Sequence, residues 1–260
     1  EVEPGEIVVI DGSGLRSIRP SGSVAQPRAH CLFEHVYFSR PDSTVFSESV
    51  QHVRFKLGRA LAREYPVEAD LVIPIPDSGN FAALGYSAES GIPFAMGFIR
   101  NHYVGRTFIQ PAQEIRDFKV RVKFNPVKKI VDGKRLVIVD DSVVRGTTTR
   151  ARVKSLREAG AKEIHLRISC PPTKHSCFYG IDFPTRKELI ANTMSLEEIR
   201  KFIGVDSLGY LSLPGLLDAV SKPKDYCTAC WSGTYPIPFG EEGDKYSLER
   251  QAKYAGQSSG

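Results

Sequence analysis

The sequence has few cysteines, no long apolar segment and no signal-like start. Five cysteines in 260 residues are too few for the disulfide framework of a small secreted protein. No apolar run approaches the roughly 20 residues needed to span a bilayer. The acidic opening EVEPGEIVVI lacks the basic region and long apolar core of a secretory signal. We therefore expect a cytoplasmic protein that makes no membrane contact.

A large excess of one charge is also missing. The chain has 35 Lys and Arg residues against 30 Asp and Glu residues, a net charge of +5, which is too small to indicate a nucleic-acid partner. Hydrophobic residues make up 41% and charged residues 25% of the chain, as in ordinary globular proteins. The length suits one large domain or a domain with a partial neighbour.

Apolar strand-like segments alternate with segments of helical periodicity along the middle of the chain. Buried strands are predicted at 71–76, 92–99 and 135–141, and the alternation of Ile164, Leu166 and Ile168 predicts a further strand at 164–168. Helices are predicted around 50–61 and 147–160, with Ser47 as the N-terminal cap of the first. This alternation predicts an α/β fold with a mostly parallel twisted sheet flanked by helices. Ligands of such sheets bind at the carboxyl ends of the strands.

The segment RLVIVDDSVVRGTTTR, residues 135–150, carries the strongest chemical signal. Its buried strand ends at Asp140 and Asp141, and a turn rich in hydroxyl groups leads into a helix. Backbone N–H groups and hydroxyls of such a turn form a cradle for a phosphate, and Gly146 lets the backbone approach closely. Two adjacent carboxylates accept hydrogen bonds from vicinal hydroxyls or hold a hydrated divalent cation. An acidic pair alone would indicate ordinary turn chemistry, whereas the whole segment fits a ribose 5-phosphate.

This segment resembles the phosphoribosyl-pyrophosphate signature of type I phosphoribosyltransferases, and most closely that of the amidophosphoribosyltransferases, which open purine synthesis. Four further blocks resemble the same family in the same order: FEHVYFSRPDS (33–43), IPDSGNFAALGYS (75–87), RNHYVGRTFIQP (100–111) and CFYGID (177–182). The resemblance covers nearly all of residues 1–232. It implies the type I phosphoribosyltransferase fold with a cysteine-ligated C-terminal segment.

The resemblance assigns a role to each part of the site. Asp140 and Asp141 would bind the ribose hydroxyls, directly or through magnesium. Asp77, Ser78 and Gly79 would form a pyrophosphate loop, with Ser78 as a magnesium ligand, although Asp-Ser-Gly-Asn after a strand is also an ordinary turn. The 5-phosphate would lie on a loop made of Ser142, Val143, Val144, Arg145, Gly146, Thr147, Thr148 and Thr149.

The positive charge of the chain is concentrated in residues 96–135, which hold ten Lys or Arg residues against three acidic ones. A solvated basic face or a nucleic-acid patch would show the same excess. In the resembling family, the loop within this segment closes over the substrate. Arg100 and Tyr103 would then bind substrate, and Arg106 would take part in catalysis beside the departing pyrophosphate.

The cysteines suggest a metal site, because Cys227 and Cys230 form a C-x-x-C pair and three more cysteines are available. Spacing alone permits zinc or an iron–sulfur cluster. It also permits mixed zinc ligation by the nearby histidines His30, His35 and His175. The resemblance implies a structural [4Fe–4S] cluster whose ligands are Cys31, Cys177, Cys227 and Cys230. Cys170 would then remain a buried thiol.

The resemblance also implies three parts of the chain. Residues 1–30 would be a remnant strand and linker of an absent glutaminase domain, 31–232 the phosphoribosyltransferase domain, and 233–260 a C-terminal tail. Because the N-terminal catalytic cysteine of that glutaminase domain is missing, we do not expect the chain alone to hydrolyse glutamine.

The implied activity is the joining of ammonia to phosphoribosyl pyrophosphate, in a homo-oligomer that purine nucleotides inhibit. Two alternatives remain open. One is a non-catalytic sensor of phosphoribosyl pyrophosphate, which would need a DNA-binding element that we do not find in the sequence. The other is a nucleobase phosphoribosyltransferase, which would need an aromatic or amide-rich hood for the base.

Overall fold

A four-stranded parallel sheet forms the centre of the computed structural model, which describes residues 2–20, 27–101 and 124–237. The strand order is β11–β10–β9–β6. The strands are β6 (Leu71–Pro74), β9 (Arg135–Asp140), β10 (Glu163–Ile168) and β11 (Ser207–Tyr210). Their registers place the carboxyl ends of β6 and β9 side by side, with Pro74 opposite Val139.

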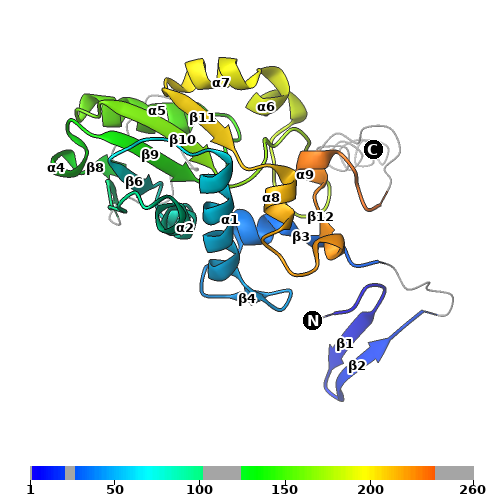
Figure 1. The fold of residues 1–260 in the computed structure, drawn as a ribbon. Coiled ribbons are helices and arrows are strands. Elements are labelled where there is room, and N and C mark those ends of the chain that lie inside the picture. The colour runs from blue at the N-terminus through cyan, green and yellow to red at the C-terminus, as the bar shows by residue number, and fades with distance from the viewer. Residues whose placement is uncertain (1, 21–26, 102–123, 238–260) are drawn as a thin grey trace, which may run out of the picture.

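Helices cover both faces of this sheet (Figure 1). The longer ones are α1 (Val50–Glu64), α2 (Asn80–Ser90), α5 (Thr147–Glu158) and α7 (Leu196–Ile203). The first two pack together on one side of the sheet, and α5 and α7 pack together on the other. None of the helices in the described ranges is long and apolar enough to cross a membrane.

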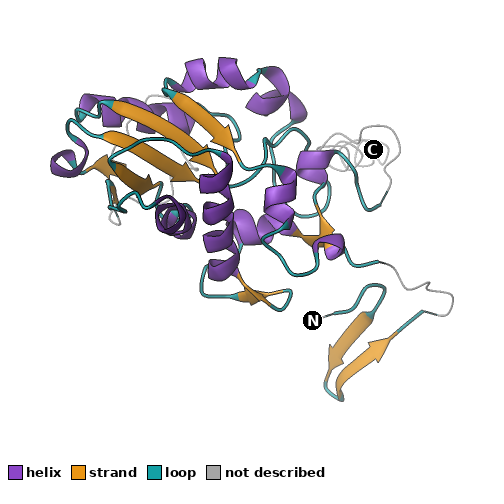
Figure 2. Cartoon of the chain, in the orientation of Figure 1, coloured by secondary structure: helices purple, strands orange, loops and turns teal. Residues whose placement is uncertain are grey.

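Short elements surround the sheet (Figure 2). The hairpin of β1 (Ile7–Asp11) and β2 (Gly14–Ile18) stands apart from the main body, as Figure 1 shows. Three other two-stranded pairs are β3 (His30–Cys31) with β12 (Tyr226–Cys227), β4 (Thr44–Val45) with β5 (Glu48–Ser49), and β7 (Phe98–Arg100) with β8 (Phe124–Pro126). The short helices are η1 (Glu34–Phe38), α4 (Lys128–Val131), η3 (Arg186–Glu188), α6 (Ile190–Thr193), α8 (Leu213–Leu217), η4 (Pro223–Asp225) and α9 (Ala229–Ser232).

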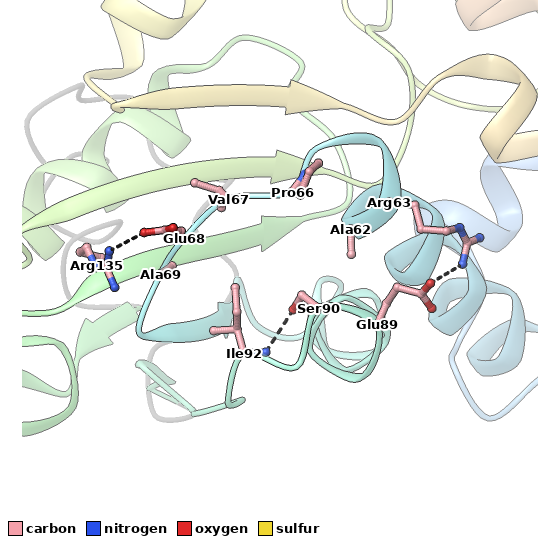
Figure 3. Close-up of a pocket in the computed structure, with 10 residues that line it drawn as sticks. All are labelled: Ala62, Arg63, Pro66, Val67, Glu68, Ala69, Glu89, Ser90, Ile92 and Arg135. Atoms are coloured by element: carbon pink, nitrogen blue, oxygen red, sulfur yellow. Dashed lines mark hydrogen bonds and ion pairs between the residues drawn. The ribbon is translucent and has the colours of Figure 1, made fainter.

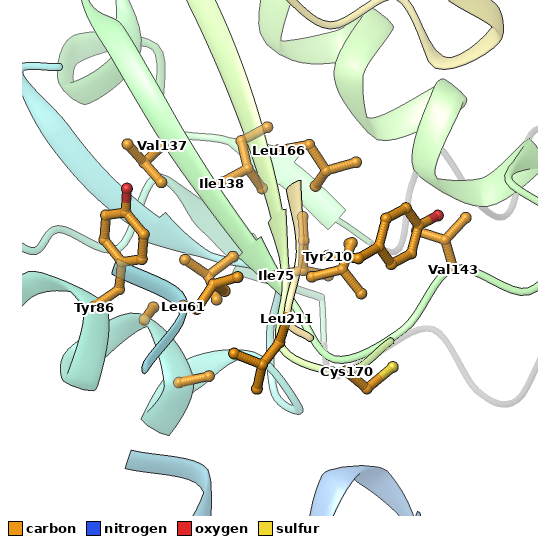
Figure 4. Packing of buried hydrophobic residues seen from close by; sticks show 14 of the residues in the cluster. Leu61, Ile75, Tyr86, Val137, Ile138, Val143, Leu166, Cys170, Tyr210 and Leu211 are labelled. Carbon is orange, nitrogen blue, oxygen red and sulfur yellow. The ribbon is translucent and has the colours of Figure 1, made fainter. Parts of the chain in front are cut away.

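One hydrophobic core joins the sheet to its helices (Figure 4). The helices α1 and α2 approach closely because glycines line their contact. A Cβ atom built on Gly58 would lie 1.8 Å from the Ala82 carbonyl oxygen, and one on Gly85 would lie 2.0 Å from that of Phe55. Larger residues at these two positions would force the helices apart.

Two local predictions are wrong. The first long helix begins at Val50 and is capped by Ser49, whose side chain accepts a hydrogen bond from His52 N at 3.4 Å. Ser47 instead adopts a left-handed conformation, with φ of 66°. The apolar run 92–99 is not one buried strand, because within it only Phe94 bridges to β6 and the end of the run belongs to β7. The predicted strands at 71–76, 135–141 and 164–168 are confirmed, with β6 ending at Pro74.

Candidate functional site

Two buried carboxylates mark the carboxyl end of β9. Asp140 is the last residue of this strand and is 4% exposed, and the next residue, Asp141, is 5% exposed. The Asp141 backbone N–H donates to Asp140 Oδ1 at 3.0 Å. Burial and the neighbouring Asp141 charge raise the pKa of Asp140 well above its ordinary value. Two acids held this close at a strand end are costly to bury, so their position calls for compensating cations.

Two arginines supply positive charge behind the acidic pair. Arg152 of α5 donates from Nη1 to Asp140 Oδ2 at 3.2 Å. Arg54 of α1 is 2% exposed, and its guanidinium donates to the His35 and Ser39 carbonyl oxygens at 2.7 and 2.8 Å. Burial lowers the pKa of Arg54, while the charge of Asp141 acts in the opposite direction. The acidic pair therefore has an ion-pair partner on α5 and an electrostatic interaction with a buried arginine on α1.

The hydroxyl-rich turn follows the acidic pair directly. Ser142 Oγ donates to Asp141 Oδ1, and Val143 is buried in the hydrophobic core that also contains Tyr210 (Figure 4). At the N-terminal cap of α5, Gly146 has φ of 75°, a conformation that favours glycine. The three threonines that begin the helix differ in exposure: Thr147 and Thr148 are exposed, and Thr149 is buried. The turn therefore presents an exposed helix N-terminus of the kind that binds phosphate groups.

A neighbouring segment holds this turn in place. Glu188 Oε1 accepts hydrogen bonds from Arg145 Nε and Nη2 at 3.1 and 2.7 Å, and its other carboxylate oxygen accepts from Thr185. The Ile190 backbone N–H donates to the Val144 carbonyl oxygen at 2.9 Å. The turn is thus braced from the segment that follows the CFYGID block.

The loop after β6 lies against the end of β9. The Ile75 N–H donates to the Val139 carbonyl oxygen at 2.8 Å. A Cβ atom on Gly79 would lie 2.4 Å from the same oxygen, so only glycine lets the loop approach this closely. The exposed Asp77 carboxylate pairs with Arg100 at the end of β7.

The structure therefore brings most of the predicted site residues to one edge of the sheet. The loop Asp77–Gly79 follows β6, the acidic pair and the turn Ser142–Thr149 lie at the end of the adjacent strand β9, and Arg100 pairs with Asp77. Tyr103 and Arg106 lie outside the described residues.

A cavity of about 560 Å³ lies elsewhere (Figure 3). Its lining includes Arg135, the first residue of β9, together with Arg63, Glu68 and Glu89. Because the acidic pair stands at the last residues of the same strand, this cavity is at the opposite edge of the sheet. None of its lining residues is a predicted site residue.

Four of the five cysteines gather near the C-terminal segment. The pairing of β3 with β12 places Cys31 directly beside Cys227. The pKa of Cys31 is raised to about 11, mainly by burial and further by Cys177. Burial also raises the pKa of Cys230, and the other three thiols add to that shift. Within the described ranges, no three His, Cys, Asp or Glu side chains converge closely enough to hold a single metal ion.

The fifth cysteine, Cys170, is 1% exposed and follows β10. Its Sγ donates to the Pro171 carbonyl oxygen at 3.3 Å. The prediction of a buried thiol at this position is confirmed.

Three residues that support the site were not predicted from the sequence: Arg54, Arg152 and Glu188. Each lies in a different element from the group it contacts, so its spacing in the chain carries no signal. Only the run of arginines after the threonines, RGTTTRARV, pointed to positive charge near the acidic pair.

Residues 47–187 match the family described as "Phosphoribosyl transferase domain". The chain is also 54% identical over 239 residues to the amidophosphoribosyltransferase of Glycine max chloroplasts, covering 91% of this chain and 42% of that protein. It is 50% identical over 251 residues to the amidophosphoribosyltransferase of Methanothermobacter thermautotrophicus, covering 96% of this chain and 52% of that protein. The chain thus spans about half the length of these curated relatives.

Two solved structures have the same fold. One, described as "Structure of the allosteric regulatory enzyme of purine biosynthesis", is 47% identical with a TM-score of 0.85 and covers 95% of this chain and 54% of that one. The other is the glutamine phosphoribosylpyrophosphate amidotransferase from B. subtilis complexed with ADP and GMP, at 48% identity, a TM-score of 0.83 and coverage of 95% and 55%. The predicted type I phosphoribosyltransferase fold is confirmed. The chain belongs to the phosphoribosyltransferase domain family, and it is similar over nearly its whole length to the amidophosphoribosyltransferases.

Proposed function

We propose that the chain forms 5-phosphoribosylamine from phosphoribosyl pyrophosphate and ammonia, the first step of de novo purine synthesis. The observation that carries this proposal is the position of two buried carboxylates, Asp140 and Asp141, between a hydroxyl-rich turn and the loop at Asp77. The names of the relatives support the choice of reaction. The name of the B. subtilis relative also points to glutamine as the source of the ammonia.

Each part of the site binds a different part of the substrate. The turn from Ser142 to Thr149 cradles the 5-phosphate at the N-terminus of α5, where backbone N–H groups favour an anion. Asp140 and Asp141 accept hydrogen bonds from the two ribose hydroxyls. The Asp77 loop faces the pyrophosphate, and the positive charge of Arg100 stabilises negative charge on the leaving group. Catalysis is then mostly a matter of positioning and electrostatics.

The oxygen donors around the acidic pair fit magnesium. Ser78, Asp140 and Asp141 offer hydroxyl and carboxylate oxygens, which magnesium prefers, and magnesium is usually held by one or two carboxylates together with substrate phosphates. When bound, the ion would neutralise charge on the pyrophosphate. Tyr103 and Arg106 complete the proposal as substrate-binding and catalytic residues in the segment outside the described ranges.

The gathered thiols support a structural [4Fe–4S] cluster held by Cys31, Cys177, Cys227 and Cys230. The Tyr179 N–H donates to Cys177 Sγ at 3.4 Å, and hydrogen bonds to the sulfurs are a usual feature of cluster sites. A single zinc ion needs its four ligands to converge on one point, whereas each thiolate of a four-iron cluster binds a different iron. The set is thus better suited to a cluster, which would fasten the C-terminal segment to the core.

The B. subtilis relative complexed with ADP and GMP supports purine nucleotides as inhibitors. A nucleoside monophosphate carries the same ribose 5-phosphate that the cradle is proposed to hold, so it would compete with the substrate. We also propose a homo-oligomer without a nucleic-acid partner.

Pyrophosphate release tests the proposed function. The purified chain is incubated with phosphoribosyl pyrophosphate and magnesium, with either ammonia or a panel of nucleobases as the acceptor. We expect pyrophosphate release with ammonia as the acceptor and none with a nucleobase. Release with a nucleobase would show a nucleobase phosphoribosyltransferase, and binding without release would show a sensor.

The cysteine assignment has its own test. Anaerobic purification is expected to give a brown protein with about four iron atoms per chain, and Cys227→Ser is expected to lose the colour and most of the iron. A Cys170→Ser variant is the control, because this thiol is not among the proposed ligands. The brown colour of the protein should persist in this variant. A colourless wild-type protein with one zinc ion would contradict the cluster.

A further inference from the structure

Arg152 has an unusual environment for a charged side chain. Its side chain is 17% exposed, and it forms an ion pair with Asp140, whose side chain is 5% exposed. Its guanidinium lies over the Phe124 ring, with Cζ 4.7 Å from the ring centroid. Its Nε is buried and has no hydrogen-bond partner within the described part of the chain.

An unpartnered buried N–H costs roughly 1–3 kcal/mol, so the hydrogen bonds of Arg152 alone do not explain its placement. The guanidinium is fixed instead by one flat aromatic face and one carboxylate oxygen. Arginine stacks on aromatic rings through its planar guanidinium, and this geometry fixes the direction in which its N–H groups point. The arrangement directs Nη1 at Asp140 Oδ2.

The Phe124 ring also belongs to a structure that reaches the pyrophosphate loop. Phe124 begins β8 and is paired in register with Arg100 of β7. Arg100 in turn forms an ion pair with Asp77. A continuous series of contacts therefore runs from Asp77 through Arg100, Phe124 and Arg152 to Asp140.

We propose that Arg152 is a positioning residue for Asp140, and that its stacking on Phe124 ties the carboxylate that grips the ribose to the strand pair that reaches the pyrophosphate loop. This inference rests on the proposed function, because it concerns the same substrate site. Both oxygens of Asp140 then have fixed donors, Asp141 N–H on Oδ1 and Arg152 on Oδ2. The carboxylate is thereby held in one orientation, with its remaining lone pairs available to the substrate.

Partners of a ligating carboxylate typically contribute a factor of about 10–100 to affinity. We expect Arg152→Met to weaken the binding of phosphoribosyl pyrophosphate with magnesium by about this factor. Arg152→Lys should recover part of the loss, because an ammonium donates to Oδ2 but does not stack as a flat group. Phe124→Leu should give a smaller loss than Arg152→Met, because it removes the ring and leaves the ion pair.

The experiment is a calorimetric titration of each variant with phosphoribosyl pyrophosphate at fixed excess magnesium, together with its thermal midpoint. Lys154→Met is the matched control: it removes a positive charge from the same helix, where Lys154 is exposed and pairs only weakly, at 3.8 Å, with Glu158. A purely structural role for Arg152 would lower the number of binding sites per chain and leave the Kd unchanged.

An Arg152→Met Kd equal to that of Lys154→Met would overturn the inference. A Phe124→Leu Kd equal to that of the wild type would overturn the part that assigns the stack a role. Both results are independent of turnover, so a wild type that binds the substrate but releases no pyrophosphate would refute the proposed reaction alone. A wild type that does not bind the substrate would refute both.

Discussion

Replacing Gly79 by alanine tests whether the loop Asp77–Gly79, proposed to bind the pyrophosphate, must lie against β9. The added Cβ would stand 2.4 Å from the Val139 carbonyl oxygen and 2.9 Å from that of Ile75. Carbon–oxygen contacts in proteins settle at about 3.3 Å or more, so the loop must move by roughly 1 Å. The backbone of Gly79, with φ of −78° and ψ of −9°, suits alanine. The effect would therefore be steric and not conformational.

The size of the effect follows from two opposing contributions. Overpacking of this kind destabilises the folded state by about 1–3 kcal/mol. Alanine also lowers the conformational entropy of the unfolded chain relative to glycine, which offsets about 0.4–1 kcal/mol of that loss. We expect a net loss of about 1–2 kcal/mol, or a thermal midpoint lower by about 2–8 °C. Because the moved loop is proposed to hold the leaving pyrophosphate, a shift of this size is expected to lower kcat/KM by about 100-fold.

The assay combines a thermal melt with the kinetics of pyrophosphate release at varied phosphoribosyl pyrophosphate. Gly12→Ala is the matched control, because its Cβ would meet nothing within 4 Å. If Gly79→Ala keeps the midpoint and the kcat/KM of Gly12→Ala, the position of the loop does not depend on its contact with β9.

Three further predictions concern packing, electrostatics and the phosphate turn. Gly58→Ala should destabilise the protein to urea by about 2 kcal/mol or more, because its Cβ would lie 1.8 Å from a carbonyl oxygen of α2; an unchanged midpoint would contradict this. Hydrogen bonds from a β10 amide and from Arg157 lower the pKa of Asp206 despite its partial burial. The stability that this carboxylate contributes is thus present at neutral pH and is lost as the pH falls below 3.8, the ordinary pKa of an aspartate. We therefore expect Asp206→Asn to lower the melting temperature at pH 7 and to reduce the fall of the melting temperature below pH 3.8. Glu188→Ala should raise the KM for phosphoribosyl pyrophosphate by about tenfold, because Arg145 loses its ion-pair partner. The melting temperature should change little, since exposed ion pairs contribute little to stability. A KM equal to that of the wild type would show that the ion pair between Glu188 and Arg145 is dispensable.

The sequence predicted the parts of the site that are contiguous in the chain. Asp140, Asp141 and the turn after them occupy one run of residues, so the strand before them and the helix after them fix where they lie. The loop at Asp77 was predicted for the same reason, since it directly follows β6. In both segments the local chemistry and the position at the end of a strand indicate the same thing, a ligand-binding site.

The supporting residues could not be predicted, because their roles depend on how separate elements pack. Arg152 reaches Asp140 only because α5 folds back beside β9, and Arg54 approaches the pair from a helix on the opposite face. The failure at 92–99 has another cause. A short apolar run does not distinguish a strand from irregular chain, and Pro93 and Gly97 within it weaken strand formation.

The two buried acids, Asp140 and Asp141, are proposed to bind the ribose of phosphoribosyl pyrophosphate. Calorimetric titration with this compound and magnesium, for the wild type and for Asp140→Asn with Asp141→Asn, tests this binding directly. We expect saturable binding to the wild type and no measurable binding to the double variant, with both proteins folded by circular dichroism. Equal affinity in the two folded proteins would contradict this expectation.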